Sequence, residues 1–219
     1  MGETEILMII KGIGETLYMT LVASALGYVI GLPWGIALCI SGKDGLHPNK
    51  IIYGILNFIT NIMRSIPFLI LLILVLPLTL LIVKKTYGST AVIVPLVISA
   101  SPLIARMVES SLNEVDRGVI EAAQAIGADT LSIIRKVLIG ESRISLISGA
   151  TITVGTILGY SAMAGTIGGG GLGNIAIQYG YYRYKADILW VTVIILVLLV
   201  QIFQFIGNLI ALKLDRRHS

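Results

Sequence analysis

Charge is scarce in this sequence, and its scarcity excludes a water-soluble globular fold. Asp, Glu, Lys and Arg make up 13% of the 219 residues and hydrophobic types 56%, against about 25% and about 45–50% in soluble domains. So few polar side chains could not cover a surface in water, so lipid must be the solvent. The net charge of +4 therefore indicates loops that face cytoplasm and lipid headgroups, and no nucleic-acid partner is expected.

Residues that carry metal or redox chemistry are equally scarce. Cys39 is the single cysteine, so no intrachain disulfide can form, and we interpret it as a small buried hydrophobic residue. The two histidines, His47 and His218, lie in separate hydrophilic stretches, so we expect neither a metal site nor a catalytic cluster. No G-x-x-x-x-G-K-[ST] motif occurs, so we expect that the chain binds no cofactor and does not hydrolyse ATP itself.

Glycine, by contrast, is abundant, and residues 168–173 satisfy the dinucleotide-binding pattern G-x-G-x-x-G. That fingerprint needs a strand before it and a helix after it to hold the pyrophosphate. Here it follows a long apolar run, so we interpret it as a flexible external connection instead.

Five charge-free runs are long enough to cross a bilayer, whose apolar core needs about 20 helical residues. They lie at about 16–42, 65–83, 86–105, 144–164 and 188–212. No basic segment precedes the first run, which we therefore expect to be a span and not a cleavable signal. Ile51–Met63 is too short to span, and a break is expected near Pro67, because the residue before proline avoids helical angles. The sequence predicts an all-α, polytopic membrane protein with one transmembrane domain over residues 1–219.

The distribution of basic residues predicts the orientation of these spans. With the N-terminus outside and the C-terminus cytoplasmic, most of the 16 basic residues face the cytoplasm, as the positive-inside rule requires. They are Lys43, Lys50, Arg64, Arg106, Arg117, Arg135, Lys136, Arg143, Lys213, Arg216 and Arg217. The long hydrophilic loop 106–143 is then cytoplasmic.

Small residues recur every fourth position in the first span. The stripe consists of Ala23, Gly27, Gly31 and Gly35, and such spacing lets helix backbones approach closely in a bilayer. We expect it to serve packing within the chain. Thr151, Gly155 and Gly159 form a similar stripe in the fourth span.

The cytoplasmic loop predicts two short helices. Asp116 can cap the first, and Gly127 can end it in a left-handed turn. Asp129 or Thr130 can cap the second, which we expect Gly140 to close. Each helix carries an apolar face, which either a partner's groove or the chain's own membrane domain could cover.

The residues of this loop resemble a known family. Glu121-Ala122-Ala123, then Gly127 and Val137-Leu138-Ile139, are similar to the EAA loop of ABC-importer permeases. The resemblance implies a type I importer permease fold, in which the loop docks on a cytoplasmic ATPase. Carried onto this chain, the ATPase-coupling residues are Glu121, Ala122, Ala123, Gly127 and Ala128. The family usually ends the motif in Leu-Pro, where this chain has Ile139-Gly140.

Other segments resemble the methionine-import branch of that family. They are residues 64–68, 102–109, 159–165, 170–174 and 178–181. The resemblance implies a homodimer in a bacterial inner membrane, joined by two ATPase subunits and an extracytoplasmic substrate-binding protein, often a lipoprotein. It also implies that methionine is the substrate and that the chain is a transport subunit and not an enzyme.

Tyr160, Ser161 and Met163 extend the small-residue stripe of the fourth span. Together with the resemblance, this position suggests a narrow gate on the translocation path, with ordinary packing as the alternative. Two other functions stay open: a permease for another amino acid or small peptide, and an ion-coupled secondary carrier. A carrier would normally place an ionisable residue inside a span, and the five runs contain none.

Overall fold

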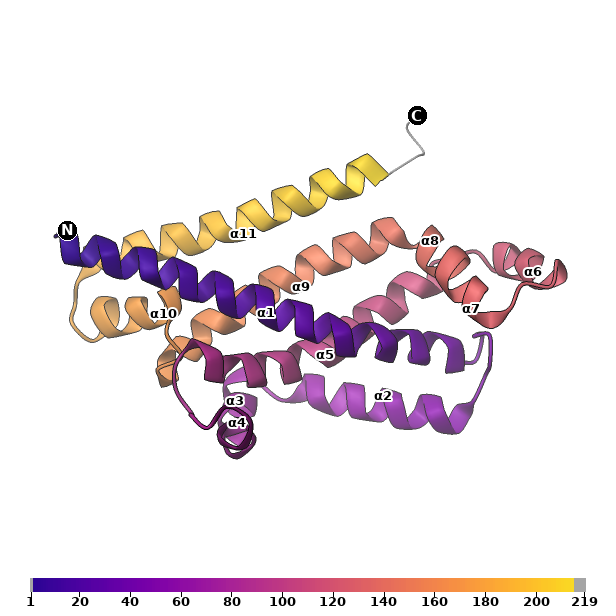
Figure 1. Cartoon of the computed structure of the whole chain (residues 1–219), viewed down its shortest axis with the longest axis horizontal. Coiled ribbons are helices and arrows are strands. Elements are labelled where there is room, and N and C mark those ends of the chain that lie inside the picture. Colours follow the sequence, from indigo (N-terminus) through magenta and orange to yellow (C-terminus); the bar gives the residue numbers. More distant parts are fainter. Residues whose placement is uncertain (1, 215–219) are drawn as a thin grey trace. The chain divides into compact units, whose positions relative to one another are not determined.

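The computed structural model describes residues 2–214, and within that range the chain forms helices and no strand (Figure 1). Arg216, Arg217 and His218 lie outside the described residues. The elements are α1 Glu3–Ser41, α2 Lys50–Ser65, α3 Phe68–Leu74, α4 Leu76–Val83, α5 Ser89–Asn113, α6 Arg117–Ala125, α7 Thr130–Ser132, η1 Ile133–Leu138, α8 Ile139–Glu141, α9 Arg143–Ala164, η2 Gly165–Ile167, α10 Gly171–Ile175, η3 Ala176–Tyr181 and α11 Ala186–Leu214.

Four of the described helices, α1, α5, α9 and α11, are long and apolar enough to cross a membrane, with α9 counted to Ile167. A fifth candidate is the pair α2 and α3, which bends by 103° at its break. The 39 residues of α1 correspond to about 58 Å of helix at 1.5 Å per residue. That length exceeds the roughly 30 Å of a bilayer core, so α1 extends beyond it.

The apolar run at 65–83 is not one continuous helix. Helix α2 ends at Ser65, before Pro67, as the proline predicts. A second break falls at Val75, and Pro77 sits in the first turn of α4, where it has no N–H to donate to the preceding turn. Two prolines therefore divide this run into the short helices α3 and α4.

The described residues divide into two compact units. The first contains the chain up to Gly27, Ile66–Ala100 and Thr153–Phe205; the second contains Tyr28–Ser65, Ser101–Ile152 and the chain from Ile206 on. Each of the four long helices contributes one part to each unit.

In the second unit, α1 packs on α5 through the predicted stripe of small residues. A Cβ atom on Gly31 would lie 2.7 Å from the Ser101 carbonyl oxygen, and one on Gly35 would lie 2.5 Å from that of Ala105. Only glycine leaves room for so close an approach of the two backbones. The expectation that the stripe serves packing within the chain is confirmed at these two positions.

In the first unit, the glycine-rich segment is closely packed, so the expectation of a flexible connection is wrong. A Cβ atom on Gly165 would overlap the backbone of Asn174, and one on Gly173 would overlap that of Ala162. The Gly171 N–H donates to Glu15 Oε2 at 2.7 Å, and the Leu172 N–H donates to Thr16 Oγ1 at 2.9 Å. Side chains of α1 thus bind the start of α10, a contact that sequence spacing alone does not reveal.

Candidate functional site

Helix α6 begins and ends where the sequence predicts. The Asp116 side chain accepts a hydrogen bond from the Gly118 N–H at 2.7 Å, which satisfies one of the free donors of the first turn. After Ala125 the chain reaches Gly127 with φ of +81°, a left-handed angle that costs a glycine little. Both ends of α6 are therefore fixed by local contacts.

The surface of α6 is open. No residue of this helix is buried, and just beyond its end Ile126 is 85% exposed. The predicted coupling residues Glu121, Ala122 and Gly127 are exposed, and Ala123 and Ala128 are half-buried. The Ala128 N–H donates to the Ala123 carbonyl at 3.1 Å. All five predicted residues thus lie on one short helix and the turn that ends it.

The second helix of the loop ends within one residue of the expected position. Asp129 caps it by accepting from the Ser132 N–H at 3.3 Å, and hydrogen bonding to Ser132 lowers the pKa of this carboxyl. Helical conformation then runs through η1 and α8 to Glu141. Gly140 lies one residue before that end, and its backbone is not left-handed, so the helix ends without a left-handed glycine cap.

The connection between α1 and α2 braces both helices of the loop. Asp44 pairs with Arg117 in the first turn of α6, with Oδ1 2.5 Å from Nη2. His47 Nε2 lies 2.9 Å from the hydroxyl oxygen of Thr130, at the start of α7. These contacts join the loop to the end of the first long helix, and no sequence pattern indicated either pairing.

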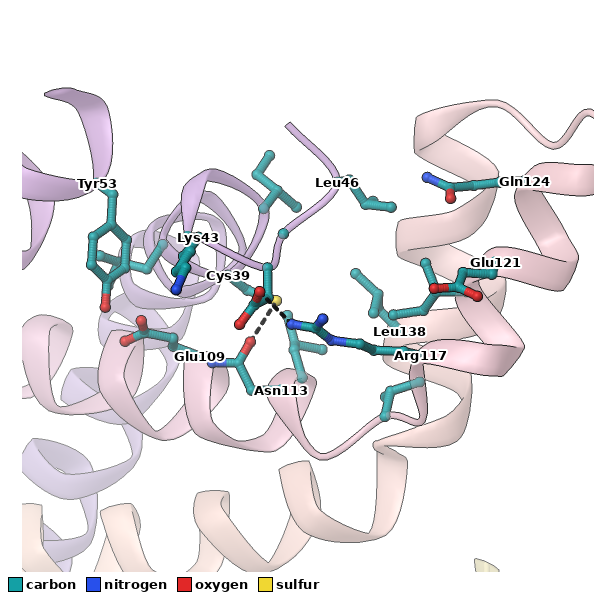
Figure 2. Close-up of a pocket in the computed structure, with 18 residues that line it drawn as sticks. Cys39, Lys43, Leu46, Tyr53, Glu109, Asn113, Arg117, Glu121, Gln124 and Leu138 are labelled. Atoms are coloured by element: carbon teal, nitrogen blue, oxygen red, sulfur yellow. Dashed lines mark hydrogen bonds and ion pairs between the residues drawn. The ribbon is translucent and has the colours of Figure 1, made fainter. Parts of the chain in front are cut away.

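A cavity of about 500 Å³ lies between this connection, α5 and α6. Its wall combines apolar groups, among them Leu38, Leu112 and Leu138, with charged and polar groups. The charged and polar side chains include Lys43, Asp44, Tyr53, Glu109, Asn113, Arg117, Glu121 and Gln124. Figure 2 shows Tyr53, Lys43 and Glu109 toward one end and Glu121 and Gln124 toward the other.

An ion pair with a buried carboxylate and a half-buried arginine holds α2 against α5 beside this cavity. Arg106 donates to Glu109 Oε2 at 2.6 Å and to the amide oxygens of Asn57 at 2.5 Å and Asn61 at 2.8 Å. Glu109 is 5% exposed, and a buried charge persists only when it is paired and hydrogen-bonded. Sequence reasoning missed this cluster; the signal available was the pair of asparagines four residues apart in a mostly apolar helix.

In the first unit, the three predicted gate residues have different surroundings. Tyr160 stacks on Phe68, with ring centroids 4.6 Å apart and planes 4° apart. Ser161 is 1% exposed and donates to the Leu158 carbonyl at 2.7 Å, whereas Met163 is 47% exposed. On a helix, positions three apart share a face, so Tyr160 and Met163 lie together and Ser161 lies apart from Met163.

Among residues 2–214, no three or more His, Cys, Asp or Glu side chains lie together in a way that could hold a metal ion.

Comparison with known proteins identifies the family. Residues 27–219 match the model of the binding-protein-dependent transport system inner membrane component. A probable D-methionine transport system permease protein, MetI, of Vibrio cholerae is 48% identical over 203 residues, which cover 93% of this chain and 90% of that protein. A methionine import system permease protein, MetP, of Bacillus subtilis is 46% identical, over 93% of this chain and 91% of the relative.

Solved structures agree with this family. A chain of the MetNI methionine ABC transporter in an inward-facing conformation matches with a TM-score of 0.97 and 44% identity, covering 99% of this chain and all of that one. A chain from an amino acid ABC transporter crystallised with histidines matches with a TM-score of 0.77 at 21% identity, over 94% of each chain, and shows the fold alone. The chain therefore belongs to the family of binding-protein-dependent transport system inner membrane components, the permease subunits of ABC transporters.

Proposed function

We propose that this chain forms the translocation path of an ATP-driven methionine importer in a bacterial inner membrane. The observation that carries the proposal is the match to the MetNI chain, at 44% identity and a TM-score of 0.97 over 99% of this chain. Because the match covers 99% of this chain, it includes the loop with α6, the glycine-rich segment and the spans.

In this proposal the chain is a single transmembrane domain that works as a homodimer with two cytoplasmic ATPase subunits. The ATPases bind and hydrolyse ATP with Mg²⁺, and an extracytoplasmic binding protein delivers methionine. The N-terminus lies outside and the C-terminus inside, as the basic loops favour.

The coupling surface of this permease is α6 with its terminal turn: Glu121, Ala122, Ala123, Gly127 and Ala128. An open helix with no buried residue suits a groove on a partner. A movement of α6 would be transmitted to the membrane-spanning helices through two sets of contacts. One is the helical path through η1 and α8 into α9, and the other is the Asp44–Arg117 brace into α1.

The gate of the path is formed by Tyr160 and Met163, which share a face of α9, with Ser161 supporting the helix from its buried side. Stacking on Phe68 fixes the Tyr160 ring, and the exposed Met163 side chain can meet its symmetry mate in the homodimer. A flexible thioether suits a seal that must open and close.

Uptake of methionine into ATP-loaded proteoliposomes tests the proposal. The chain is assembled with the ATPase and binding protein of its cell, and ATP-dependent uptake is expected. The double variant Glu121→Ala with Gly127→Ala should abolish uptake while the matched control, Glu114→Ala with Gly54→Ala, transports normally. Both control residues are exposed, and a Cβ on Gly54 meets nothing within 4 Å.

Other outcomes contradict parts of the proposal separately. ATP-dependent uptake of a different amino acid or a small peptide, with no uptake of methionine, contradicts the substrate. Uptake that follows an imposed ion gradient without ATP contradicts the ABC mechanism and indicates a secondary carrier. Wild-type uptake by the α6 double variant contradicts the coupling surface alone.

A further inference from the structure

The short helix α10 has no capping side chain of its own. Its N-cap position is Gly170, and the helix that follows has only five residues, Gly171–Ile175. The first N–H groups of a helix have no partner inside it, and helices this short rarely persist by themselves. Another part of the chain must therefore satisfy these donors and hold α10 in place.

Helix α1 supplies the missing cap through two consecutive side chains. The Gly171 N–H donates to Glu15 Oε2 at 2.7 Å, and the Leu172 N–H donates to Thr16 Oγ1 at 2.9 Å. Thr16 is buried, whereas the Glu15 side chain is 29% exposed. Hydrogen bonds to a carboxylate are stronger than those to a neutral oxygen. Glu15 therefore makes the stronger of these two bonds, which together we call the α1–α10 clasp.

The clasp depends on glycine at two positions. Gly170 and Gly171 have φ angles of +79° and +74°. A Cβ atom on Gly170 would lie 2.7 Å from Glu15 Oε2, and one on Gly171 would lie 2.7 Å from Thr16 Oγ1. The start of a helix attracts anions. A carboxylate of the same chain thus occupies the helix start at which the dinucleotide fingerprint would hold a pyrophosphate.

The clasp holds a segment that also contacts α5 and α9, and all of these contacts lie within the first unit. The Gly88 N–H, just before α5, donates to the Gly168 carbonyl at 3.0 Å. A Cβ atom on Gly169 would lie 2.7 Å from the carbonyl oxygen of Ala164, the last residue of α9. A displacement of this segment would therefore alter its contacts with three long helices together.

In the proposed function, the clasp lies toward the outer end of the translocation path. The N-terminal half of α1 carries it, and the N-terminus is outside in the proposed orientation. The chain matches one from an inward-facing transporter with a TM-score of 0.97. A path that is open to the inside must be closed at its outer end, because a path open at both ends would leak.

We propose that Glu15 is a positioning residue of the transport cycle: its carboxylate holds α10 against α1 while the path is closed to the outside, and the clasp opens when the path opens to the outside. The direction of this change rests on the proposed function, whereas the capping of α10 by Glu15 depends on the fold alone. A contact made in only one of two conformations favours that conformation. Weakening the clasp should therefore favour the outward-open state.

Amide exchange of the whole transporter tests the clasp on the unmodified chain. The chain, assembled with its ATPase in nanodiscs, is compared free of nucleotide and trapped with ATP and vanadate, which should open the path to the outside. Peptides covering residues 165–175 should exchange roughly tenfold faster in the trapped state, the change expected when one hydrogen bond to a charged group is lost. Peptides covering residues 194–204 of α11 are the reference and should not change.

Variants separate a positioning role from simple loss of stability. In Glu15→Ala the acceptor is lost, so residues 165–175 should exchange at the trapped-state rate even without nucleotide, and ATP hydrolysis without binding protein should increase. In Glu15→Gln an amide oxygen can still accept from Gly171, so most of the protection should remain. The matched control Glu3→Ala, also exposed on α1, should behave as wild type. The thermal midpoint of each complex checks its folding.

The contrary results are distinct. Equal exchange of residues 165–175 in the two states of the wild type overturns the opening of the clasp. Unchanged exchange in Glu15→Ala overturns the capping of α10, and faster exchange with reduced ATP hydrolysis shows a purely structural contact and overturns the positioning role. Because the measurement uses ATP and no substrate, absence of methionine uptake by the wild type contradicts the proposed function and leaves the result on the clasp standing.

Discussion

The contact of α1 with α5 predicts that alanine at Gly31 or Gly35 destabilises the protein. Alanine at Gly14, in the same helix, should not. In Gly31→Ala the new methyl group would lie 2.7 Å from the Ser101 carbonyl oxygen and from Ile104 Cβ. In Gly35→Ala it would lie 2.5 Å from the Ala105 carbonyl oxygen. Ordinary carbon contacts are about 3.5–4.0 Å, so the helices must separate by about 1 Å to admit either methyl group.

The size of the effect follows from that overlap. Forcing a methyl group into a packed contact costs about 1–3 kcal/mol. Backbone atoms form part of each contact, so the neighbours cannot simply rotate away. Gly14→Ala, where nothing lies within 4 Å, should instead gain about 0.5–1 kcal/mol from the better helix former. For a chain of this size 1 kcal/mol corresponds to about 2–4 °C in thermal midpoint.

The assay is thermal denaturation of the purified transporter in one detergent, followed by loss of the intact peak in gel filtration. Gly31→Ala and Gly35→Ala should each lower the midpoint by about 2–12 °C, and Gly14→Ala should leave it unchanged or raise it slightly. Equal midpoints for all three variants would show that the stripe does not pack on α5. A large loss in Gly14→Ala alone would place the essential contact of α1 elsewhere, for example on a second copy of the chain.

Three further predictions concern the loops. In Gly127→Ala the alanine must adopt a left-handed backbone angle, which costs a residue with a side chain roughly 1–2 kcal/mol, so amide exchange in α6 should accelerate. In the control Gly140→Ala, where φ is not positive and nothing lies within 4 Å, amide exchange should not change. The hydrogen bonds of its cap lower the pKa of Asp129. The cap therefore stabilises α7 at pH values above the ordinary pKa of the group, and this contribution is lost as the pH falls through the pKa of the folded state. Amide exchange in α7 should accordingly be faster near pH 3, relative to the intrinsic rate, than at pH 7. The hydrogen bond and ion pair with Glu5 raise the pKa of Lys185. The stability that this pair contributes is complete at pH values below the ordinary lysine pKa and is lost as the pH rises through the pKa of the folded state. Above that pH the thermal midpoints of Lys185→Met and wild type should converge.

Features that depend on neighbouring residues were predictable from the sequence. The caps at Asp116 and Asp129, the left-handed turn at Gly127 and the break before Pro67 all involve contacts over four residues or fewer. Their physical cause is contained in the side chain itself: an oxygen that accepts from the next turn, a missing Cβ, or a ring that excludes helical angles. The long apolar runs were also predictable, because helices that cross lipid need uninterrupted apolar stretches.

Features that depend on distant partners were not predictable. The Glu15 carboxylate meets the Gly171 N–H across 156 positions of sequence, and Asp44 meets Arg117 with no pattern to indicate it. Glycine shows the limit most clearly. Gly140 stands next to a helix end at Glu141, as expected, whereas Gly173 resembles a flexible joint and is packed on the Ala162 backbone. A missing side chain permits several roles, and only the neighbours decide among them.

The open surface of α6 determines how its variants should be interpreted. A helix of nine residues is marginal in isolation, because nucleation is costly and helices shorter than about 12–15 residues rarely persist in water. No buried side chain of α6 compensates for that cost. Its order must then come from the Asp116 cap, the Gly127 turn, the ion pair of Arg117 with Asp44 and the contact of α6 with η1, together with the partner's groove in the proposed function. If α6 is the coupling helix as proposed, a change in any of the first three should reduce ATP-driven transport with little loss of overall stability, because no residue of α6 is buried among the spans.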